Sequence, residues 1–432
     1  MAGEIKSRPK KGSIKKMLGL QGYLKDKSME SLDHRILSFD AFIQDLKNKE
    51  EHNYFRLIES PPGREIIVRD EKSQIKHKMI MFGSNNYLGF GNHPYVKSSV
   101  KKAIDTFGSG LGGPAILNGY TVLMKRLEQR ISILKHQEDA IIFPAGYNAN
   151  LGFVSALITD KDLIIYDELC HASFYDALRL GNVKGIKFKH NDLNELESIL
   201  IKYTSLVEGR IWVCMEGVYS MDGDFAPLSE MIPMIRKYGA YSMLDDAHGT
   251  GVIGKDGSGT AAYFGVSKEI DISMGTFSKS FAVTGGFLSG SKEIINYMRY
   301  FARPYMFSAS LPPMTLAAIL AGLDLIEKEP ELIKSLQKNI LYANKILSSY
   351  GFESNTSTPI ISFIIPEWMN IRKANALIHR YGIFLNAIEY PAVPKNKQRF
   401  RISLMAQHTQ EDIQKLGEVL DLVWKDKRVR LK

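Results

Sequence analysis

DISMGTFSKSFAVTGGFLSG, residues 271–290, places a single lysine shortly after an apolar run that is typical of a buried strand. The run covers residues 272–274, and Lys279 follows it among hydroxyl-bearing residues and glycines. A lysine in such a setting can lose its proton through desolvation and act as an amine nucleophile. The stretch therefore predicts a site around Lys279, although a lysine on a surface turn would give the same local pattern.

Short apolar runs alternate with helical patterns along the chain from residue 139 onward. The expected strands are residues 140–143, 163–166, 185–188, 211–215, 241–244 and 272–274, with helices such as 193–203 and 228–238 between them. This alternation predicts βαβ units, and hence an α/β fold whose mainly parallel sheet carries helices on both faces. Ligands of such sheets bind beyond the carboxyl ends of the strands.

Polar or small residues that could serve chemistry follow five of these runs. They are, in chain order, Gly146 and Tyr147; Asp167, His171 and Ser173; Glu216, Tyr219, Ser220 and Asp222; Asp245, Asp246 and His248; and Thr276, Ser278 and Lys279. Each has an ordinary structural explanation when taken alone, such as a helix cap or a core histidine. Because all of them follow strands of the same sheet, they are expected to lie at one edge of that sheet and to form a single site.

A lysine, a strand-ending aspartate, an imidazole and several hydroxyls suit the chemistry of pyridoxal 5'-phosphate (PLP). The lysine forms the Schiff base, a carboxylate keeps the pyridine nitrogen protonated, and hydroxyl and backbone N–H groups bind the phosphate. A hydrolytic Ser/His/Asp site is the competing interpretation, but the sequence has no GxSxG elbow. Metal binding by His248 with Asp245 lacks the further ligands that zinc needs, so no metal is expected.

Composition limits the classes of protein to consider. The 432 residues, 44% hydrophobic and 24% charged, are typical of a globular chain with two domains. The net charge of +9 favours anionic partners, but no zinc-finger spacing or aromatic RNA-binding signature accompanies it, so nucleic acid is not expected. Cys170 and Cys214 form no CxxC pair, and neither a secretory signal nor an apolar run long enough to span a bilayer is evident. We therefore expect a cytoplasmic protein.

The first residues of the chain form a basic leader. Its charges are Lys6, Arg8, Lys10, Lys11, Lys15 and Lys16. Such a leader could make peripheral contact with the inner face of an anionic membrane, and a solvated tail is the simpler alternative.

Five motifs resemble those of the α-oxoamine synthases, PLP-dependent acyltransferases with the aspartate aminotransferase fold (fold type I). The motifs are SNNYLG at 84–89, HAS at 171–173, EGVYSMDGD at 216–224, DDAHGTG at 245–251 and GTFSKS at 275–280. The resemblance covers about residues 54–420 and implies that an amino acid condenses with an acyl thioester and loses CO2. YFRLIES at 54–60, MGTFSKS at 274–280 and YMFSASLP at 305–312 are most similar to bacterial serine palmitoyltransferases, which favours serine and a long-chain acyl-CoA or acyl-carrier substrate.

The resemblance also implies a role for each matching residue. Lys279 is the expected Schiff-base lysine and acid/base, Asp245 the partner of the pyridinium, and His171 the ring stacked on the cofactor. The remaining positions are His248 at the phenolic oxygen; Gly146, Tyr147, Ser220 and Thr276 around the cofactor and its phosphate; Asn85 and Arg401 at the amino-acid carboxylate; and Ser308, which reaches the phosphate of the partner subunit in a homodimer with composite active sites.

The same resemblance implies four segments. They are a basic leader and helix at 1–53, an N-terminal segment of the small domain with an active-site loop at 54–110, a large PLP-binding domain at 111–345, and a small α/β C-terminal domain at 346–432. In the last of these we expect strands near 360–364 and 400–404 and helices at 374–381 and 411–424.

Three departures from the family pattern leave the substrate open. Pro114-Ala115 stands where the family has Ser-Arg, and Met124 stands where it has His. Glu389 replaces an arginine that assists carboxylate binding, so it could repel a substrate carboxylate or favour a differently charged amino acid. The alternatives are an 8-amino-7-oxononanoate synthase, a 2-amino-3-ketobutyrate CoA ligase, an acyltransferase for a sulfonated amino acid, and a non-catalytic regulatory subunit, which would be expected to lack Lys279.

Overall fold

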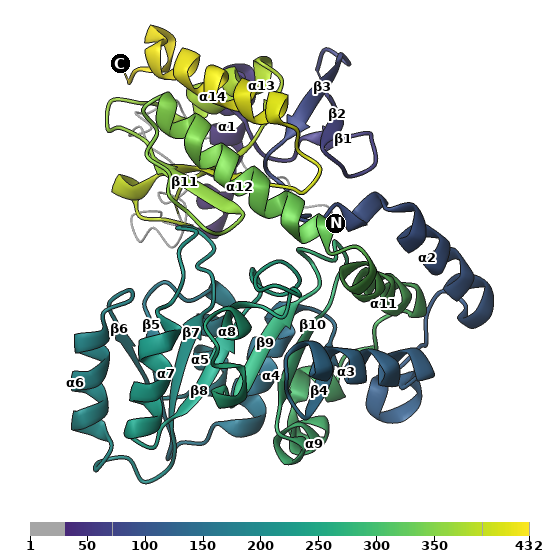
Figure 1. Ribbon diagram of the computed structural model, residues 1–432. Helices are drawn as coiled ribbons and strands as arrows, with labels where there is room; N and C mark the ends of the chain where they lie inside the picture. The colour runs from purple at the N-terminus through teal and green to yellow at the C-terminus, as the bar shows by residue number, and fades with distance from the viewer. Residues whose placement is uncertain (1–30, 71, 391, 432) are drawn as a thin grey trace, which may run out of the picture.

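The computed structural model describes residues 31–70, 72–390 and 392–431 (Figure 1). Most of the basic leader lies outside these ranges, so its contact with a membrane stays a prediction. Within the described ranges, no helix has both the length and the apolar character needed to cross a bilayer.

A seven-stranded sheet forms the centre of the larger part of the molecule, with strand order β4-β10-β9-β8-β7-β5-β6 (Figure 1). Its strands are β4 (Asp139–Phe143), β5 (Leu163–Asp167), β6 (Gly185–Phe188), β7 (Ile211–Glu216), β8 (Tyr241–Asp245), β9 (Ile272–Thr276) and β10 (Gly286–Gly290). The pairs from β9 through β6 are parallel, whereas β10 is antiparallel to both β9 and β4. The predicted α/β fold with a mainly parallel sheet is confirmed. We did not predict β10, because its glycine-bordered sequence GFLSG lacks a run of β-branched residues.

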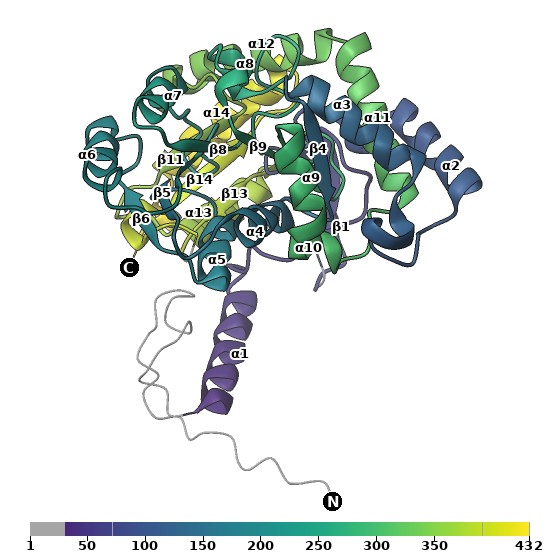
Figure 2. The same cartoon turned by 90° about the horizontal axis from the view of Figure 1, so that it is seen from below.

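Helices cover both faces of this sheet, as Figure 2 shows from below. One face is covered by α4 (Gly146–Leu157), α5 (Ala172–Gly181) and α9 (Lys292–Phe301), and the other by α3 (Val122–Leu134), α6 (Leu193–Tyr203) and α7 (Leu228–Lys237). In β7, for example, Cys214 packs on the α4 side and Val213 on the α7 side. Because both faces are buried, the strands read as continuous apolar runs rather than as alternating ones. Two short helices, α8 (Thr260–Tyr263) and α10 (Arg303–Met306), complete this part of the chain.

The C-terminal part forms a second, smaller α/β unit at the top of Figure 1. Its antiparallel sheet has the strand order β11-β14-β13. The helices α12, α13 and α14 and the short strand β12 make up the rest of this unit. Their bounds are α12 (Glu331–Ser349), β11 (Ile360–Ile364), α13 (Ile371–Arg380), β12 (Ile383–Phe384), β13 (Asn386–Ile388), β14 (Arg399–Ser403) and α14 (Gln410–Lys425). A capping box between Thr409 and Asp412 starts α14. The expected strands and helices of this region are thus present within a few residues.

The N-terminal strands join this smaller unit through β12. They are β1 (Leu57–Ile58), β2 (Glu65–Arg69) and β3 (Lys76–Met81), and β3 pairs in parallel with β12, with Ile80 opposite Ile383. α1 (Leu32–Asn48) projects from the body of the molecule (Figure 2), and α2 (Pro94–Phe107) packs along α11 (Pro313–Lys328). The division of the chain at residues 110 and 345 stays a prediction.

Candidate active site

The carboxyl ends of β5, β7, β8 and β9 lie at one edge of the large sheet, on the side that faces the smaller unit (Figure 1). Asp167, Glu216, Asp245 and Thr276 are the last residues of these strands. The structure therefore brings together the strand ends at which the sequence predicted a site.

Lys279 lies on a tight turn directly after β9. The backbone N–H of Ala282 donates to the Lys279 carbonyl at 2.9 Å, and Ala282 adopts a left-handed φ of 55°, so the turn is closed by the backbone itself. Desolvation lowers the pKa of the Lys279 ammonium to about 8, although the charge of Asp245 opposes this shift. About a tenth of Lys279 is therefore a neutral amine at pH 7, and about half at pH 8.

The two neighbouring aspartates at the end of β8 have different surroundings. Asp246 is fully buried and bound by Lys135 Nζ at 2.6 Å and by Thr260 Oγ1 at 2.7 Å, so its charge is already compensated. Asp245 is only partly buried, and it accepts hydrogen bonds from Asn150 Nδ2 at 3.1 Å and from the Ala247 N–H at 3.1 Å. Of the two, Asp245 is the carboxylate that remains available to a ligand.

Asn150 is a site residue that sequence reasoning missed. Its fully buried side chain donates from Nδ2 to Asp245 Oδ2 and to Ser173 Oγ, the latter at 2.9 Å. The signal that could have found it is its spacing: Asn150 lies four residues after Gly146 on α4, so both lie on the same helix face. Asn150 therefore fixes the orientation of the Asp245 carboxylate.

His171 precedes α5 as its N-cap residue. Its Nδ1 accepts from the Ser173 N–H at 3.2 Å and lies 2.8 Å from Ser173 Oγ, while the residue itself is exposed. Partial desolvation lowers the pKa of the His171 imidazole, with Asp245 opposing and Lys279 adding to the shift. The ring is thus held by one nitrogen, is neutral at neutral pH, and has surface free for stacking.

His248 and Tyr87 form a buried pair, with 2.7 Å between His248 Nδ1 and the Tyr87 hydroxyl. Burial and the nearby charge of Lys279 lower the pKa of His248 well below its ordinary value, and burial raises the pKa of Tyr87 to about 12. Both groups are therefore uncharged at neutral pH. The sequence predicted a role for His248 but none for Tyr87, which also donates to Asn85 Oδ1 at 3.2 Å.

Arg401 lies on β14 of the smaller unit, and its side chain reaches the site. Its Nη1 donates to Asn85 Oδ1 at 3.1 Å and to Ser403 Oγ at 3.1 Å, and its Nε donates to the Ser220 carbonyl at 2.6 Å. Arg401 as a whole residue is 4% exposed, so its guanidinium is buried and is not a surface charge. The predicted pair of Asn85 and Arg401 is therefore in direct contact.

The start of α4 offers a cradle for an anion. Its N-cap residue, Ala145, has no side chain that could bind the first N–H groups of the helix. A Cβ atom at Gly146 would lie 3.0 Å from Thr276 Cβ, and one at Gly286 would lie 2.6 Å from the Gly146 nitrogen, so only glycines keep this approach open. Thr276 Oγ1 and Ser278 Oγ lie 2.9 Å apart beside it. These groups fit a phosphate.

Two predicted residues lie at the margin of this arrangement. Tyr147 is exposed and donates from its hydroxyl to Asp176 Oδ2 at 2.7 Å, so its ring, not its hydroxyl, is available to a ligand. Ser308 lies between α10 and α11 and is partly buried. The role expected of Ser308 depends on a second chain and stays a prediction.

Comparison with known proteins agrees with this geometry. A model of the family described as aminotransferase class I and II matches residues 77–420. The chain belongs to this family. It is similar to a serine palmitoyltransferase of Bacteriovorax stolpii, with 39% identity over 87% of this chain and 88% of that protein. It is also similar to a putative 8-amino-7-oxononanoate synthase of Acetivibrio thermocellus, with 37% identity over 87% of this chain and 95% of that protein. Within the aminotransferase class I and II family, the chain is thus an enzyme, an acyltransferase of the α-oxoamine synthase type.

Solved structures give the same result. A serine palmitoyltransferase from S. paucimobilis, solved with a bound PLP–myriocin aldimine, superposes with a TM-score of 0.85 at 30% identity and covers 91% of this chain and 98% of its own. PLP is the cofactor of this family member, and the anion cradle at Gly146, the available Asp245 carboxylate and the partly neutral Lys279 amine fit its phosphate, ring nitrogen and aldehyde.

Proposed function

We propose that this α-oxoamine synthase condenses L-serine with a long-chain acyl-CoA. The new bond joins the α-carbon of serine to the acyl carbon; the thioester bond breaks to release the free thiol, and the serine carboxyl leaves as CO2, so that an aminoketone remains. The observation that carries the proposal is the meeting of Lys279, Asp245 and His171 at one sheet edge, opposite the buried Arg401. Similarity to two serine palmitoyltransferases supports the choice of serine.

The cofactor and the residues around it would make different contributions to this reaction. When bound, PLP supplies an aldehyde that joins to amines and a ring that withdraws electrons from the adjoining carbon. Asp245, oriented by Asn150 at 3.1 Å, supplies the negative charge that holds a ring nitrogen protonated. His171, neutral and fixed through Nδ1, supplies a flat surface for the ring without adding a charge.

Lys279 moves protons in this scheme. Its pKa of about 8 lets the Nζ atom exist both as a neutral amine and as an ammonium near neutral pH. The neutral amine can take the proton from the α-carbon of the amino acid, and the resulting ammonium can return a proton to the product carbon. A pKa near the working pH serves both directions.

Arg401 and Asn85 orient the amino acid. A buried guanidinium is the group best suited to a carboxylate, since its donors are fixed in a plane. Arg401 already donates to Asn85, Ser403 and the Ser220 carbonyl, so its position is set before substrate arrives. A carboxylate held there would place the α-carbon in a fixed direction relative to Lys279.

The proposal includes a homodimer whose sites use Ser308 of the opposite chain. The Ser310 N–H donates to the Gly113 carbonyl at 3.0 Å and so joins two segments of the chain. Each segment carries a large exposed apolar side chain near this bond: Leu117 is 79% exposed and Phe307 is 73% exposed. Large exposed apolar side chains at this density mark a protein contact surface. Mixing Lys279→Ala and Ser308→Ala chains tests the composite site, since a mixed dimer holds one site with both residues intact. Activity above either parent supports the dimer, and no gain counts against it.

A second candidate is the 8-amino-7-oxononanoate synthase reaction, in which alanine replaces serine. The comparable similarity to the A. thermocellus protein favours it. Serine and alanine differ by one hydroxyl, so the two candidates require the same residues for cofactor, carboxylate and proton transfer.

An amino-acid panel with acyl-CoA and acyl-carrier thioesters of graded chain length tests the proposal. Serine, alanine, glycine and cysteic acid are each supplied with a carbon-14 carboxyl group, and release of labelled CO2 is measured together with free thiol. We expect serine with a long-chain acyl-CoA to give the highest kcat/KM. A preference for alanine would support the second candidate, and no release with any pair would overturn both. The Lys279→Ala variant provides the background.

A further inference from the structure

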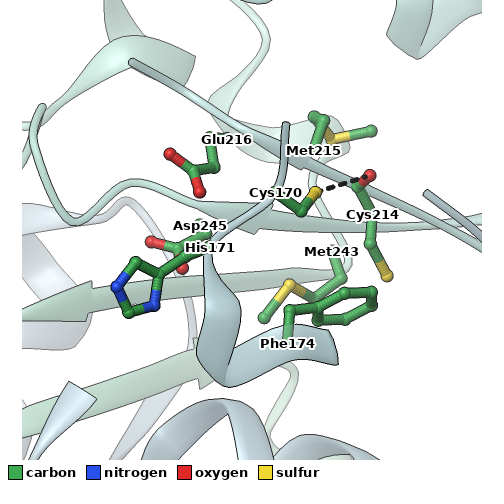
Figure 3. A pocket seen from close by; sticks show the side chains of 8 residues that line it. All are labelled: Cys170, His171, Phe174, Cys214, Met215, Glu216, Met243 and Asp245. Carbon is green, nitrogen blue, oxygen red and sulfur yellow. Dashed lines mark hydrogen bonds between the residues drawn. The ribbon is translucent and has the colours of Figure 1, made fainter. Parts of the chain in front are cut away.

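A small cavity lies behind the catalytic edge, between β5, β7 and β8 (Figure 3). Its lining is mostly sulfur and hydrocarbon, together with two carboxyl groups and one imidazole. The lining residues are Cys170, His171, Phe174, Cys214, Met215, Glu216, Met243 and Asp245. Figure 3 shows the carboxyl groups of Glu216 and Asp245 and the His171 ring on the same side of this cavity. Glu216 is a buried ionisable group to which the mechanism above assigns no task.

Glu216 and Asp245 are neighbours across two parallel strands. They end β7 and β8, and their Cα atoms are directly paired in the sheet register. Two carboxylates so placed, in surroundings of low polarity, repel each other strongly, so one proton is retained by the pair.

The surroundings determine which carboxyl group keeps that proton. Asp245 is partly exposed and accepts from Asn150 Nδ2 and the Ala247 N–H. Glu216 is 3% exposed, and its Oε1 has no hydrogen-bond partner among the described residues. A buried carboxylate with one oxygen left unpartnered is more costly than a neutral carboxyl group in the same place. Burial, together with the charge of Asp245, raises the pKa of Glu216 well above its ordinary value.

Resting on the proposed function, we infer that Glu216 is a positioning residue that works as a neutral acid. The backbone N–H groups of His171 and Ser220 act electrostatically on its carboxyl group, which therefore lies beside both of the loops that carry these predicted cofactor contacts. Because it is neutral, it leaves Asp245 as the single anion of the pair, available to the ring nitrogen of the cofactor.

The charged and titratable groups around Glu216 come from every neighbouring element. They are Asp245 at the end of β8, Lys279 after β9, Cys170 and His171 between β5 and α5, and Tyr219 in its own loop. Lys279 and the two backbone N–H groups favour the ionised form, whereas burial and Asp245 oppose it more strongly.

The first test uses the apoenzyme, so that neither cofactor nor substrate enters the result. A carboxyl group with a raised pKa binds its proton in the folded state and loses it in the unfolded state, whose pKa is about 4.3. It therefore stabilises the fold less and less as pH rises above that value. Urea unfolding of wild type and Glu216→Gln is compared at pH 5 and pH 8. We expect the glutamine variant to gain stability relative to wild type between these two pH values. A difference between the two proteins that is the same at pH 5 and pH 8 would show that Glu216 is already ionised in the folded protein at pH 5, and would overturn the inference.

The second test follows PLP in the holoenzyme by visible absorbance. Glu216→Gln keeps a neutral oxygen acceptor, so the pH midpoint of the cofactor band is expected to stay within about 0.5 unit of wild type. Glu216→Leu removes the acceptor and is expected to weaken PLP binding about tenfold. A midpoint shift of a unit or more in Glu216→Gln, or unchanged PLP affinity in Glu216→Leu, would contradict the inference. If the leucine variant does not fold, Glu216→Asp, which withdraws the acceptor by one methylene, gives the same comparison.

Glu128→Gln is the matched control. Glu128 is also buried, at 2% exposure, with its Oε1 unpartnered among the described residues, but it lies on α3 and is bound by Arg299 and Tyr120, outside the site. We expect Glu128→Gln to change the free energy of unfolding and to leave the pH midpoint of the cofactor band at its wild-type value. Since the urea experiment needs no substrate, its outcome separates a failure of this inference from a failure of the proposed condensation.

Discussion

Arg372 binds the carboxylate of Glu389 through two hydrogen bonds, 3.2 Å from Nε and 2.8 Å from Nη2. The Tyr54 hydroxyl donates to the same carboxylate at 2.7 Å. The two side chains of the ion pair are 10% and 13% exposed, and the Arg372 guanidinium lies 5.1 Å from the centre of the Phe42 ring on α1. Glu389, the residue expected from the family resemblance to be an arginine, thus has its charge compensated within the protein and is not free to repel a substrate carboxylate.

Glu389→Ala tests this relationship. Removing the carboxylate leaves the Arg372 cation buried without a partner, so we expect the free energy of unfolding to fall by about 3 kcal/mol. The KM for the amino acid is expected to stay near the wild-type value, because the lost charge was already compensated. Urea unfolding and steady-state kinetics measure the two effects. The double variant Glu389→Leu/Arg372→Leu should recover part of the stability, since it removes both charges. A lower KM with unchanged stability would show instead that Glu389 acts on the substrate.

Lys279 is expected to make PLP capture by the apoenzyme dependent on pH. Only the neutral amine attacks an aldehyde, and desolvation sets its pKa at about 8. The initial rate of capture should therefore fall about tenfold for each pH unit below 8 and level off above it. Stopped-flow absorbance of apoenzyme mixed with PLP gives this rate, corrected for the ionisation of free PLP. Lys279→Ala should show no visible band and lose turnover by about 10³-fold or more, and Lys279→Arg is the control that keeps a cation. A midpoint near that of an ordinary lysine would contradict the assignment.

The sequence was sufficient to predict features that depend on local patterns. Each strand of the large sheet is buried on both faces, so its apolar run stands out, and a ligand site at the strand ends follows from the topology alone. The expected strand at 272–274 and the observed β9 (Ile272–Thr276) differ by only two residues. The position of Lys279 depends only on that strand and on the turn after it. One stretch of 20 residues was therefore enough to predict the site.

Features that depend on distant contacts could not be predicted in this way. The bonds from Tyr54 to Glu389 and from Asn150 to Asp245 join residues 335 and 95 positions apart. Spacing places Asn150 on the same helix face as Gly146, but nothing in the flanking sequence identifies the partner of Asn150 or of Tyr54. The antiparallel β10 was missed for a related reason. A glycine is required at position 286 by its close approach to the start of α4, a tertiary constraint that hides the strand character of β10. Met124 and Ala115, two departures from the family pattern, are buried side chains, at 1% and 6% exposure.

His190 is expected to stabilise the loop that carries Ser220, and to do so in a pH-dependent manner. Its Nδ1 lies 3.2 Å from Asp167 and its Nε2 2.8 Å from Asp224 in that loop. Burial opposes the imidazolium, but the hydrogen bonds to the two aspartates outweigh it and raise the pKa of His190 to about 10. The stabilisation is therefore complete below the unfolded-state pKa of about 6.5 and is lost as pH rises through about 10.

His190→Gln should accordingly lower the free energy of unfolding by about 2 kcal/mol at pH 6, with the deficit closing above pH 10. Urea unfolding at pH 6, 8 and 10 measures it, and His77→Gln, at an exposed position on β3, is the control. A deficit that is the same at all three pH values would mean that His190 is neutral and that its contribution is packing alone.

Arg399 and Arg401 lie on the same face of β14, yet we expect their variants to fail in different ways. Both reach the loop that contains Ser220: Arg399 Nη1 donates to the Met221 carbonyl at 3.0 Å and to Asp222 Oδ1 at 2.6 Å, while Arg401 donates to the Ser220 carbonyl. Nη1 of Arg399 is occupied by the loop and its Nε by the Lys397 carbonyl, so Arg399 joins the two units of the fold. Arg401 also contacts Asn85, which places it beside the predicted carboxylate position.

Arg401→Lys removes the planar donor set, so the KM for the amino acid should rise about 10- to 100-fold, with the KM for the acyl thioester little changed. Arg399→Lys should instead lower the free energy of unfolding and weaken PLP binding, because the loop that carries Ser220 loses an anchor, while the amino-acid KM at saturating PLP stays near wild type. Initial-rate kinetics with each substrate varied, together with PLP titration of the apoenzymes, separate the two patterns. Identical defects in both variants would mean that Arg401, like Arg399, serves only to hold the loop, and that the amino-acid carboxylate binds elsewhere.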